Sequence, residues 1–159
     1  MIAVADASPL CYLVLIGEID LLSKLFSTVL APEAVLNELL HEDAPAVVRQ
    51  WASNLPPWVR AESTPQITST DLERLQGGER AAIILAESIN ADILLLDEKA
   101  ARRLAGQRGI SVTGTLGVLV EAAMEGYVDL PTAIDRLRQT NFRCSPALLK
   151  ATLDQLGAM

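Results

Sequence analysis

Short apolar runs alternate along the chain with longer segments in which apolar residues recur at every third or fourth position. The short runs are typical of buried strands, and the longer segments are typical of helices with one buried face. We therefore expect strands near residues 2–5, 28–30, 58–61, 92–96 and 110–112, with helices between them. This alternation predicts an α/β fold, a three-layer α/β/α sandwich around a mostly parallel central sheet.

The length and the composition favour one domain with a large core. The chain has 159 residues, of which 50% are hydrophobic and 4% aromatic, and we expect a single domain over residues 1–159. No apolar stretch approaches the roughly 18 residues that a membrane-spanning helix needs, and the amino end lacks the basic flank of a signal peptide. We expect a cytoplasmic protein that does not associate with membranes.

The first apolar run, Ile2–Ala5, ends at an acid, Asp6. Ser8 and Pro9 then favour a helix start, with Ser8 as the N-cap and Pro9 as the first helical residue. Asp6 would lie just past the carboxyl end of a strand, where open α/β sheets bind their ligands. Two interpretations stay open at this point: a metal ligand, or an aspartate that only caps the next helix.

The same pattern recurs later in the chain, where an apolar run ends at Asp97. If the two strands are neighbours in a parallel sheet, Asp6 and Asp97 lie together at its carboxyl edge. Two carboxylates that close repel each other strongly unless a cation lies between them, which favours a metal site. Thr113 and Thr115 are expected at the same edge, where Thr115 either caps the next helix or contacts a phosphate or water.

Two further acids lie on predicted helices. Glu38 is in the middle of a helix over residues 33–40, beside its apolar stripe, and lies either on the solvated face or at a cleft. Glu79 is in the first turn of a strongly apolar helix, where the helix dipole alone favours an acid. Gly77 and Gly78 precede Glu79 and leave space for a substrate or a metal to approach.

Several common kinds of site are missing from the sequence. There is no glycine-rich phosphate-binding loop, and a single histidine, His41, argues against a Ser-His-Asp hydrolase. Cys11 and Cys144 are not at metal-binding spacing, and we expect free thiols in a reducing compartment. The carboxylates remain, and they suit hard cations such as Mg²⁺ or Mn²⁺, which can promote attack of water on a phosphodiester.

Four segments together resemble the motif blocks of PIN-domain proteins. They are V-A-D-A-S-P-L from Val4, P-E-A-V-L-N-E-L from Pro32, G-G-E-R-A-A-I-I-L-A from Gly77 and L-L-L-D-E-K-A-A-R-R-L-A from Leu94. Their order and spacing are more specific than any one block, and the resemblance extends from residue 2 to about residue 124. The sequence is most similar to the VapC-like, DUF3368-like branch, whose toxins are the ribonuclease halves of toxin–antitoxin pairs.

The resemblance implies metal-dependent hydrolysis of RNA. By position, the family's acids correspond to Asp6, Glu38, Glu79 and Asp97, of which Asp6, Glu79 and Asp97 would hold Mg²⁺ or Mn²⁺. The secondary candidates are Ser8, Glu98, Thr113 and Thr115. Two features depart from the family pattern, because the third acid is commonly Asp and the turn at residues 113–115 lacks a further acid. Both departures favour one ion, or weak binding, over a tight pair.

The net charge of −7 argues against nucleic-acid binding over the whole surface, but four of the 13 bases fall within residues 99–108. Lys99, Arg102 and Arg103 would contact RNA phosphates, unless they form only a solvated helix face. The resemblance also implies a cognate antitoxin and a homodimer as partners. Two alternatives stay open: a PIN-like module that lacks catalysis and acts through a partner, and a receiver-type domain, which would need a lysine that does not follow Val112.

Overall fold

The computed structural model describes residues 1–143 and 146–157. Its centre is a five-stranded sheet in the order β3-β2-β1-β4-β5. The strands are β1 (Ile2–Ala5), β2 (Thr28–Pro32), β3 (Val59–Glu62), β4 (Ile93–Leu95) and β5 (Val112–Thr113). Each neighbouring pair in this sheet is parallel, so the expected α/β fold is confirmed.

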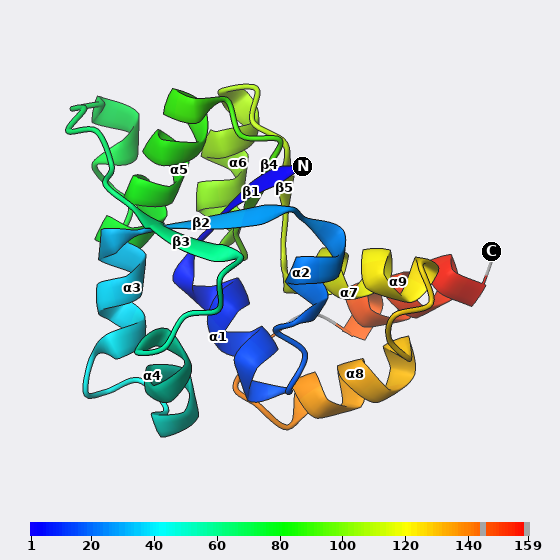
Figure 1. Cartoon of the computed structure of the whole chain (residues 1–159). Helices are drawn as coiled ribbons and strands as arrows, with labels where there is room; N and C mark the ends of the chain where they lie inside the picture. Colours follow the sequence, from blue (N-terminus) through cyan, green and yellow to red (C-terminus); the bar gives the residue numbers. More distant parts are fainter. Residues whose placement is uncertain (144–145, 158–159) are drawn as a thin grey trace.

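Helices connect the strands and cover both faces of the sheet (Figure 1). They are α1 (Ala7–Leu15), α2 (Leu21–Leu25), α3 (Glu33–Leu40), α4 (Ala46–Ala52), the 3-10 turn η1 (Thr70–Leu72), α5 (Gly77–Ile89), α6 (Lys99–Gln107), α7 (Thr115–Met124), α8 (Leu130–Arg138) and α9 (Pro146–Gly157). None of the helices within the described residues is long and apolar enough to cross a membrane.

The two faces of the sheet bury different helices because successive strand residues point to opposite sides. Ala3 and Ala5 of β1 belong to a core shared with α1, α2, α3, α4, α7 and α8. Val4, between them, belongs to a second core that contains the apolar residues of α5 and α6. Figure 1 shows α5 and α6 on one side of the sheet and α1, α2 and α7 on the other, which is the predicted three-layer arrangement.

The strand order makes the carboxyl ends of β1 and β4 the expected place for a ligand. The chain moves from β1 outward through β2 to β3, and then returns to the other side of β1 to form β4 and β5. Neighbouring strands whose connections leave in opposite directions form a topological switch point, the usual ligand site of open α/β sheets. Ala5 pairs with Leu95 here, and the Asp6 amide donates to the Leu95 carbonyl at 2.9 Å.

Two local expectations were wrong. The helix after β1 begins at Ala7, so Asp6, and not Ser8, occupies its N-cap position. Ser8 is already in the first turn, where Pro9 is tolerated because first-turn amides have no partner within the helix. The last strand is also displaced, from 110–112 to Val112–Thr113, and α7 begins at Thr115 with Gly114 at its N-cap.

Candidate active site

Asp6 lies at the end of the central strand and is almost fully buried, with 4% of its surface exposed. It stands at the N-cap of α1 but makes no capping hydrogen bond with its side chain, so capping does not explain its presence. Burial, above all, raises the pKa of Asp6 to about 7; the Ala7 amide opposes this shift, and the charges of Glu38, Glu79 and Asp97 add to it. The electrostatic contributions show that the four acids share one region.

Asp97 follows β4 and is fixed by the first residue of α7. The Thr115 amide donates to Asp97 Oδ1 and the Thr115 hydroxyl donates to Oδ2, both at 2.7 Å. Burial raises the pKa of Asp97, while the two hydrogen bonds from Thr115 and the charge of Arg102 lower it. Gly114 leaves space for the carboxylate, because a Cβ there would lie 2.6 Å from Asp97 Oδ1. Thr115 therefore orients an acid and does not cap its helix.

Glu38 lies on α3, with its carboxylate against the start of α5. A Cβ at Gly78 would overlap Glu38 Oε1, so only glycine permits this approach. Burial raises the pKa of Glu38, and a hydrogen bond from the Gly78 amide partly offsets it. The glycine before Glu79 thus makes room for another acid of the chain.

Glu79 is the third residue of α5, and its carboxylate turns back to the Gln76 amide, as in a capping box. Burial raises the pKa of Glu79, and the charge of Glu98 contributes next, followed in the opposite direction by the Gln76 hydrogen bond. The other oxygen, Oε2, is buried without a hydrogen-bond partner. Helix capping therefore explains the position of one carboxylate oxygen of Glu79 and leaves the other without a partner.

The unpartnered oxygens test whether these residues suit a divalent cation. Asp6 Oδ1 and Glu79 Oε2 are both buried and without a hydrogen-bond donor. Buried acceptors are normally satisfied, and Mg²⁺ and Mn²⁺ prefer oxygen ligands, commonly one or two carboxylates together with water. The donor chemistry therefore fits such an ion.

The side chains of the four acids interact through their charges but do not converge on one point. Within residues 1–143 and 146–157, no three histidine, cysteine, aspartate or glutamate side chains lie close enough together to hold one metal ion. The four acids share an electrostatic field without forming a preformed ligand cage. Side-chain movement among these acids would be needed to bring three carboxylates to one ion.

The secondary candidates have mainly local roles in the structure. Glu98 is exposed and is the N-cap of α6, where its carboxylate accepts the Ala101 amide at 2.8 Å. Ser8 is half-buried in the first turn of α1. Thr113 ends β5, and its hydroxyl lies where a Cβ on Gly117 would be, which packs β5 closely on α7. Thr115 is the one that contacts a proposed site acid.

The basic residues of α6 differ from one another. Lys99, Arg102 and Arg103 are all exposed, and of these three Arg102 lines a cavity of about 360 Å³ beside Asp97. Arg108 forms ion pairs away from the acids, to Asp71 at 2.8 Å and to Glu87 at 2.9 Å. One of the expected RNA-contacting residues therefore adjoins the acids.

Three residues near Asp97 were not predicted from the sequence. Phe142 and Arg143 line the cavity from the segment before α9, and Tyr12 of α1 holds the Phe142 ring edge-on, with centroids 5.0 Å apart. Burial raises the pKa of Tyr12, and the charge of Asp97 acts in the same direction. No motif marks these residues, because they reach the site only through the packing of α1 against the carboxyl-terminal segment. Cys11 is free and half-buried, while Cys144 lies outside the described residues.

The fold and the strand-end acids define a class: parallel α/β proteins with a carboxylate-lined site at the switch point of the sheet. A family model described as DUF3368, PIN domain, matches residues 2–158. The chain belongs to the PIN-domain family, whose members are typically nucleases and generally use divalent metals. No curated protein and no solved structure matches the chain.

Proposed function

We propose that this protein is a divalent-metal-dependent endoribonuclease that acts as the toxin of a toxin–antitoxin pair. The main support is Asp6, which is buried with one unpartnered oxygen and whose pKa is raised to about 7, in part by three other acids. Such an arrangement is unfavourable in isolation and becomes favourable beside a doubly charged cation. A cation bound here would link the site to phosphodiester hydrolysis, the reaction typical of the family.

Asp6, Glu79 and Asp97 would hold Mg²⁺ or Mn²⁺, with Glu38 binding directly or through water. The ion would supply positive charge for activating water and for stabilising the reacting phosphate. The chain itself orients the acids: Thr115 holds Asp97, and the amides of Gly78 and Gln76 hold Glu38 and Glu79.

The substrate would be RNA, approached from the side of α6. Arg102 would contact a phosphate beside Asp97, and Lys99 and Arg103 would attract the strand from the exposed face of the same helix. A cognate antitoxin would block the site by presenting a basic side chain to the acids and an apolar helix to a groove. A homodimer is the expected assembly.

A second candidate is a module of the same fold that lacks catalysis and acts through a protein partner. It is favoured by the spacing of the acids, since no three of the metal-ligating side chains in the described part of the chain are close enough to hold an ion. The capping roles of Glu79 and Glu98 point in the same direction.

An RNA cleavage assay separates the two candidates. Purified protein with Mg²⁺ or Mn²⁺ should cleave a labelled RNA, and a chelator should stop it. Asp6→Asn and Asp97→Asn should abolish cleavage, whereas Asp129→Asn, which alters the N-cap of α8, should retain it. Cleavage by Asp6→Asn at the wild-type rate would refute the assignment. For the toxin role, induced expression of wild type should arrest growth and Asp6→Asn should not.

A further inference from the structure

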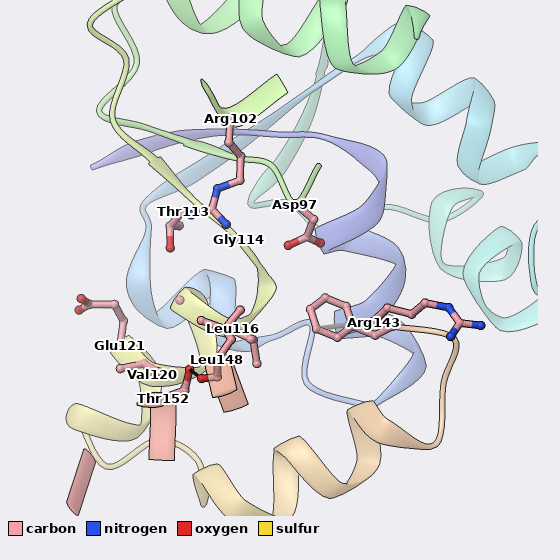
Figure 2. Close-up of a pocket in the computed structure, with 12 residues that line it drawn as sticks. Asp97, Arg102, Thr113, Gly114, Leu116, Val120, Glu121, Arg143, Leu148 and Thr152 are labelled. Atoms are coloured by element: carbon pink, nitrogen blue, oxygen red, sulfur yellow. Dashed lines mark hydrogen bonds between the residues drawn. The ribbon is translucent and has the colours of Figure 1, made fainter. Parts of the chain in front are cut away.

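A cavity of about 360 Å³ opens directly beside Asp97, between β5, α7 and α9 (Figure 2). This volume is at the lower end of the range of about 300–1,000 Å³ that is usual for small-ligand pockets. Its walls are of two kinds. Asp97, Arg102, Glu121 and Arg143 supply charges, and Leu116, Val120 and Phe142 supply apolar and aromatic surface.

Arg102 supplies the positive charge next to the acid. A Cβ at Gly114 would lie 2.6 Å from Asp97 Oδ1 and 3.3 Å from Arg102 Nη1, so both side chains converge over this glycine. Figure 2 shows Arg102 reaching from α6 toward Gly114. Among the described residues Arg102 has no ion-pair partner, in contrast to Arg108. Its charge also lowers the pKa of Asp97, so a phosphate bound by this guanidinium would lie beside that carboxylate.

Phe142 supplies an aromatic surface whose position is fixed. Its ring meets Tyr12 edge-on, at an interplanar angle of 86°, and the Phe142 amide donates to the Thr140 hydroxyl at 3.1 Å. Leu116 and Val120 of α7 line the same cavity and are buried. An aromatic ring and an apolar floor in the same cavity as a guanidinium form a combination that can accept a stacked base and its phosphate.

We propose that this cavity binds one unpaired nucleotide of the RNA substrate. The inference rests on the proposed function and specifies how its substrate would be held. The phosphate lies on Arg102, within reach of Asp97, and the base lies against Phe142, Leu116 and Val120. Because a base paired in a duplex cannot enter such a cavity, the site selects single-stranded or looped RNA.

The charged residues at the rim of the cavity indicate the path of the RNA backbone. The Arg143 side chain leads away from the cavity in Figure 2 and is exposed, which suits a contact with the next phosphate along the strand. Glu121 lies at another part of the rim, also exposed, and would repel a phosphate placed there. The backbone therefore passes along the side of Arg102 and Arg143.

Binding can be measured apart from cleavage. A short fluorescent single-stranded RNA of mixed sequence would be titrated with the full chain in EDTA, and its anisotropy recorded. Arg102→Ala should weaken binding about tenfold, and Arg138→Ala, a change at an exposed arginine of α8 that does not line the cavity, should weaken it less than twofold. Thr152→Phe, which narrows the cavity without changing charge, and Phe142→Leu, which removes the ring, should also weaken binding about tenfold.

The outcomes distinguish this proposal from the proposed function. If Arg102→Ala, Thr152→Phe and Phe142→Leu, each shown to be folded by its melting curve, bind the RNA as wild type does, the cavity is not a nucleotide site, even if the protein cleaves RNA. Equal binding of a duplex of the same sequence would also overturn it. If wild type binds the RNA but never cleaves it with Mg²⁺ or Mn²⁺, the cavity stands and the nuclease assignment fails. If wild type binds no RNA but binds a fluorescent acidic peptide, and Arg102→Ala weakens that binding, the cavity is occupied by a protein segment and the proposal is wrong.

Discussion

Thr115 holds both oxygens of Asp97, through its amide to Oδ1 and its hydroxyl to Oδ2, each at 2.7 Å. Thr115 is completely buried, so water does not compete for these bonds. The start of α7 therefore fixes the orientation of the acid at the end of β4. An acid held at both oxygens presents its remaining lone pairs in a defined direction, which a metal site requires.

Replacing Thr115 by Val should test how the orientation of the Asp97 carboxylate affects cleavage, because the carboxylate itself is retained. The variant keeps the shape and the amide bond but loses the hydroxyl donor to Asp97 Oδ2, which should cost about 1–3 kcal/mol in the free energy of unfolding. RNA cleavage should fall about tenfold in kcat, since Asp97 would be less well oriented. Steady-state kinetics and chemical denaturation would measure both effects. Thr132→Val is the matched control, because Thr132 also donates its amide and its hydroxyl to an aspartate, in this case both to Oδ2 of Asp129 at the start of α8. Thr132→Val should leave kcat unchanged, and an unchanged kcat in Thr115→Val would contradict the role of Thr115.

Two adjacent glycines should respond differently to alanine. A Cβ at Gly78 would overlap Glu38 Oε1, whereas a Cβ at Gly77 has no atom within 4 Å. Gly78→Ala should displace Glu38 and lower cleavage at least tenfold. Gly77→Ala should keep cleavage and raise stability by about 0.4–1 kcal/mol, because alanine restricts the unfolded chain. Rates and denaturation curves of the pair would test this, and equal rates would show that the position of Glu38 does not matter.

The metal-free protein should lose stability as the pH rises toward neutrality. The pKa of Asp6 is raised from 3.8 to about 7, so between these values the folded state binds more protons than the unfolded state. Its free energy of unfolding should therefore fall by roughly 2–4 kcal/mol from pH 4 to pH 8 because of this group. The raised pKa values of Glu38, Glu79 and Asp97 act in the same direction.

Denaturation in EDTA across this pH range would measure the effect. Asp6→Asn cannot titrate, so its stability relative to wild type should increase from pH 4 to pH 8. Asp129→Asn is the control of opposite sign, because hydrogen bonds from Thr132 lower the pKa of Asp129 and favour its charged form in the folded state. A wild-type curve parallel to that of Asp6→Asn would show that Asp6 titrates normally.

Divalent ions should reverse this loss. Binding only to the folded state at a hundred times the dissociation constant stabilises by about 2.7 kcal/mol, and the cation competes with the proton on Asp6. Mg²⁺ or Mn²⁺ should therefore raise the melting temperature of wild type more at pH 8 than at pH 5. Thermal melts with increasing metal would show this, and Asp6→Asn should give a much smaller shift. An equal shift in both proteins would place the ion elsewhere.

The fold could be predicted from the sequence because its strands and helices follow simple apolar patterns. The proximity of Asp6 and Asp97 also followed from pattern, since each acid ends an apolar run and β1 and β4 are neighbours. The boundaries were less predictable: Ser8 has the chemistry of an N-cap, yet the helix starts earlier because the chain must turn directly after β1.

The surroundings of the acids depend on contacts between distant segments, which a single sequence does not specify. Thr115 looked like a helix cap, and its bond to Asp97 depends on how β5 delivers α7 to the sheet edge. Arg108 belongs to the same basic cluster of the sequence as Arg102, but the structure pairs it with Asp71 of η1 and Glu87 of α5. Phe142 and Arg143 follow no pattern and reach the cavity through the tertiary fold alone.

The place of β1 in the middle of the sheet has a consequence for synthesis. β1 lies between β2 and β4, and the Ile2 amide bonds the Asp92 carboxylate across 90 residues of sequence. During synthesis, β1 can therefore pair only with β2 until β4 has left the ribosome. Contacts between residues so far apart in the sequence also form slowly. Asp6 and Asp97 cannot meet before that moment, so the proposed metal site cannot form on a growing polypeptide that still lacks β4.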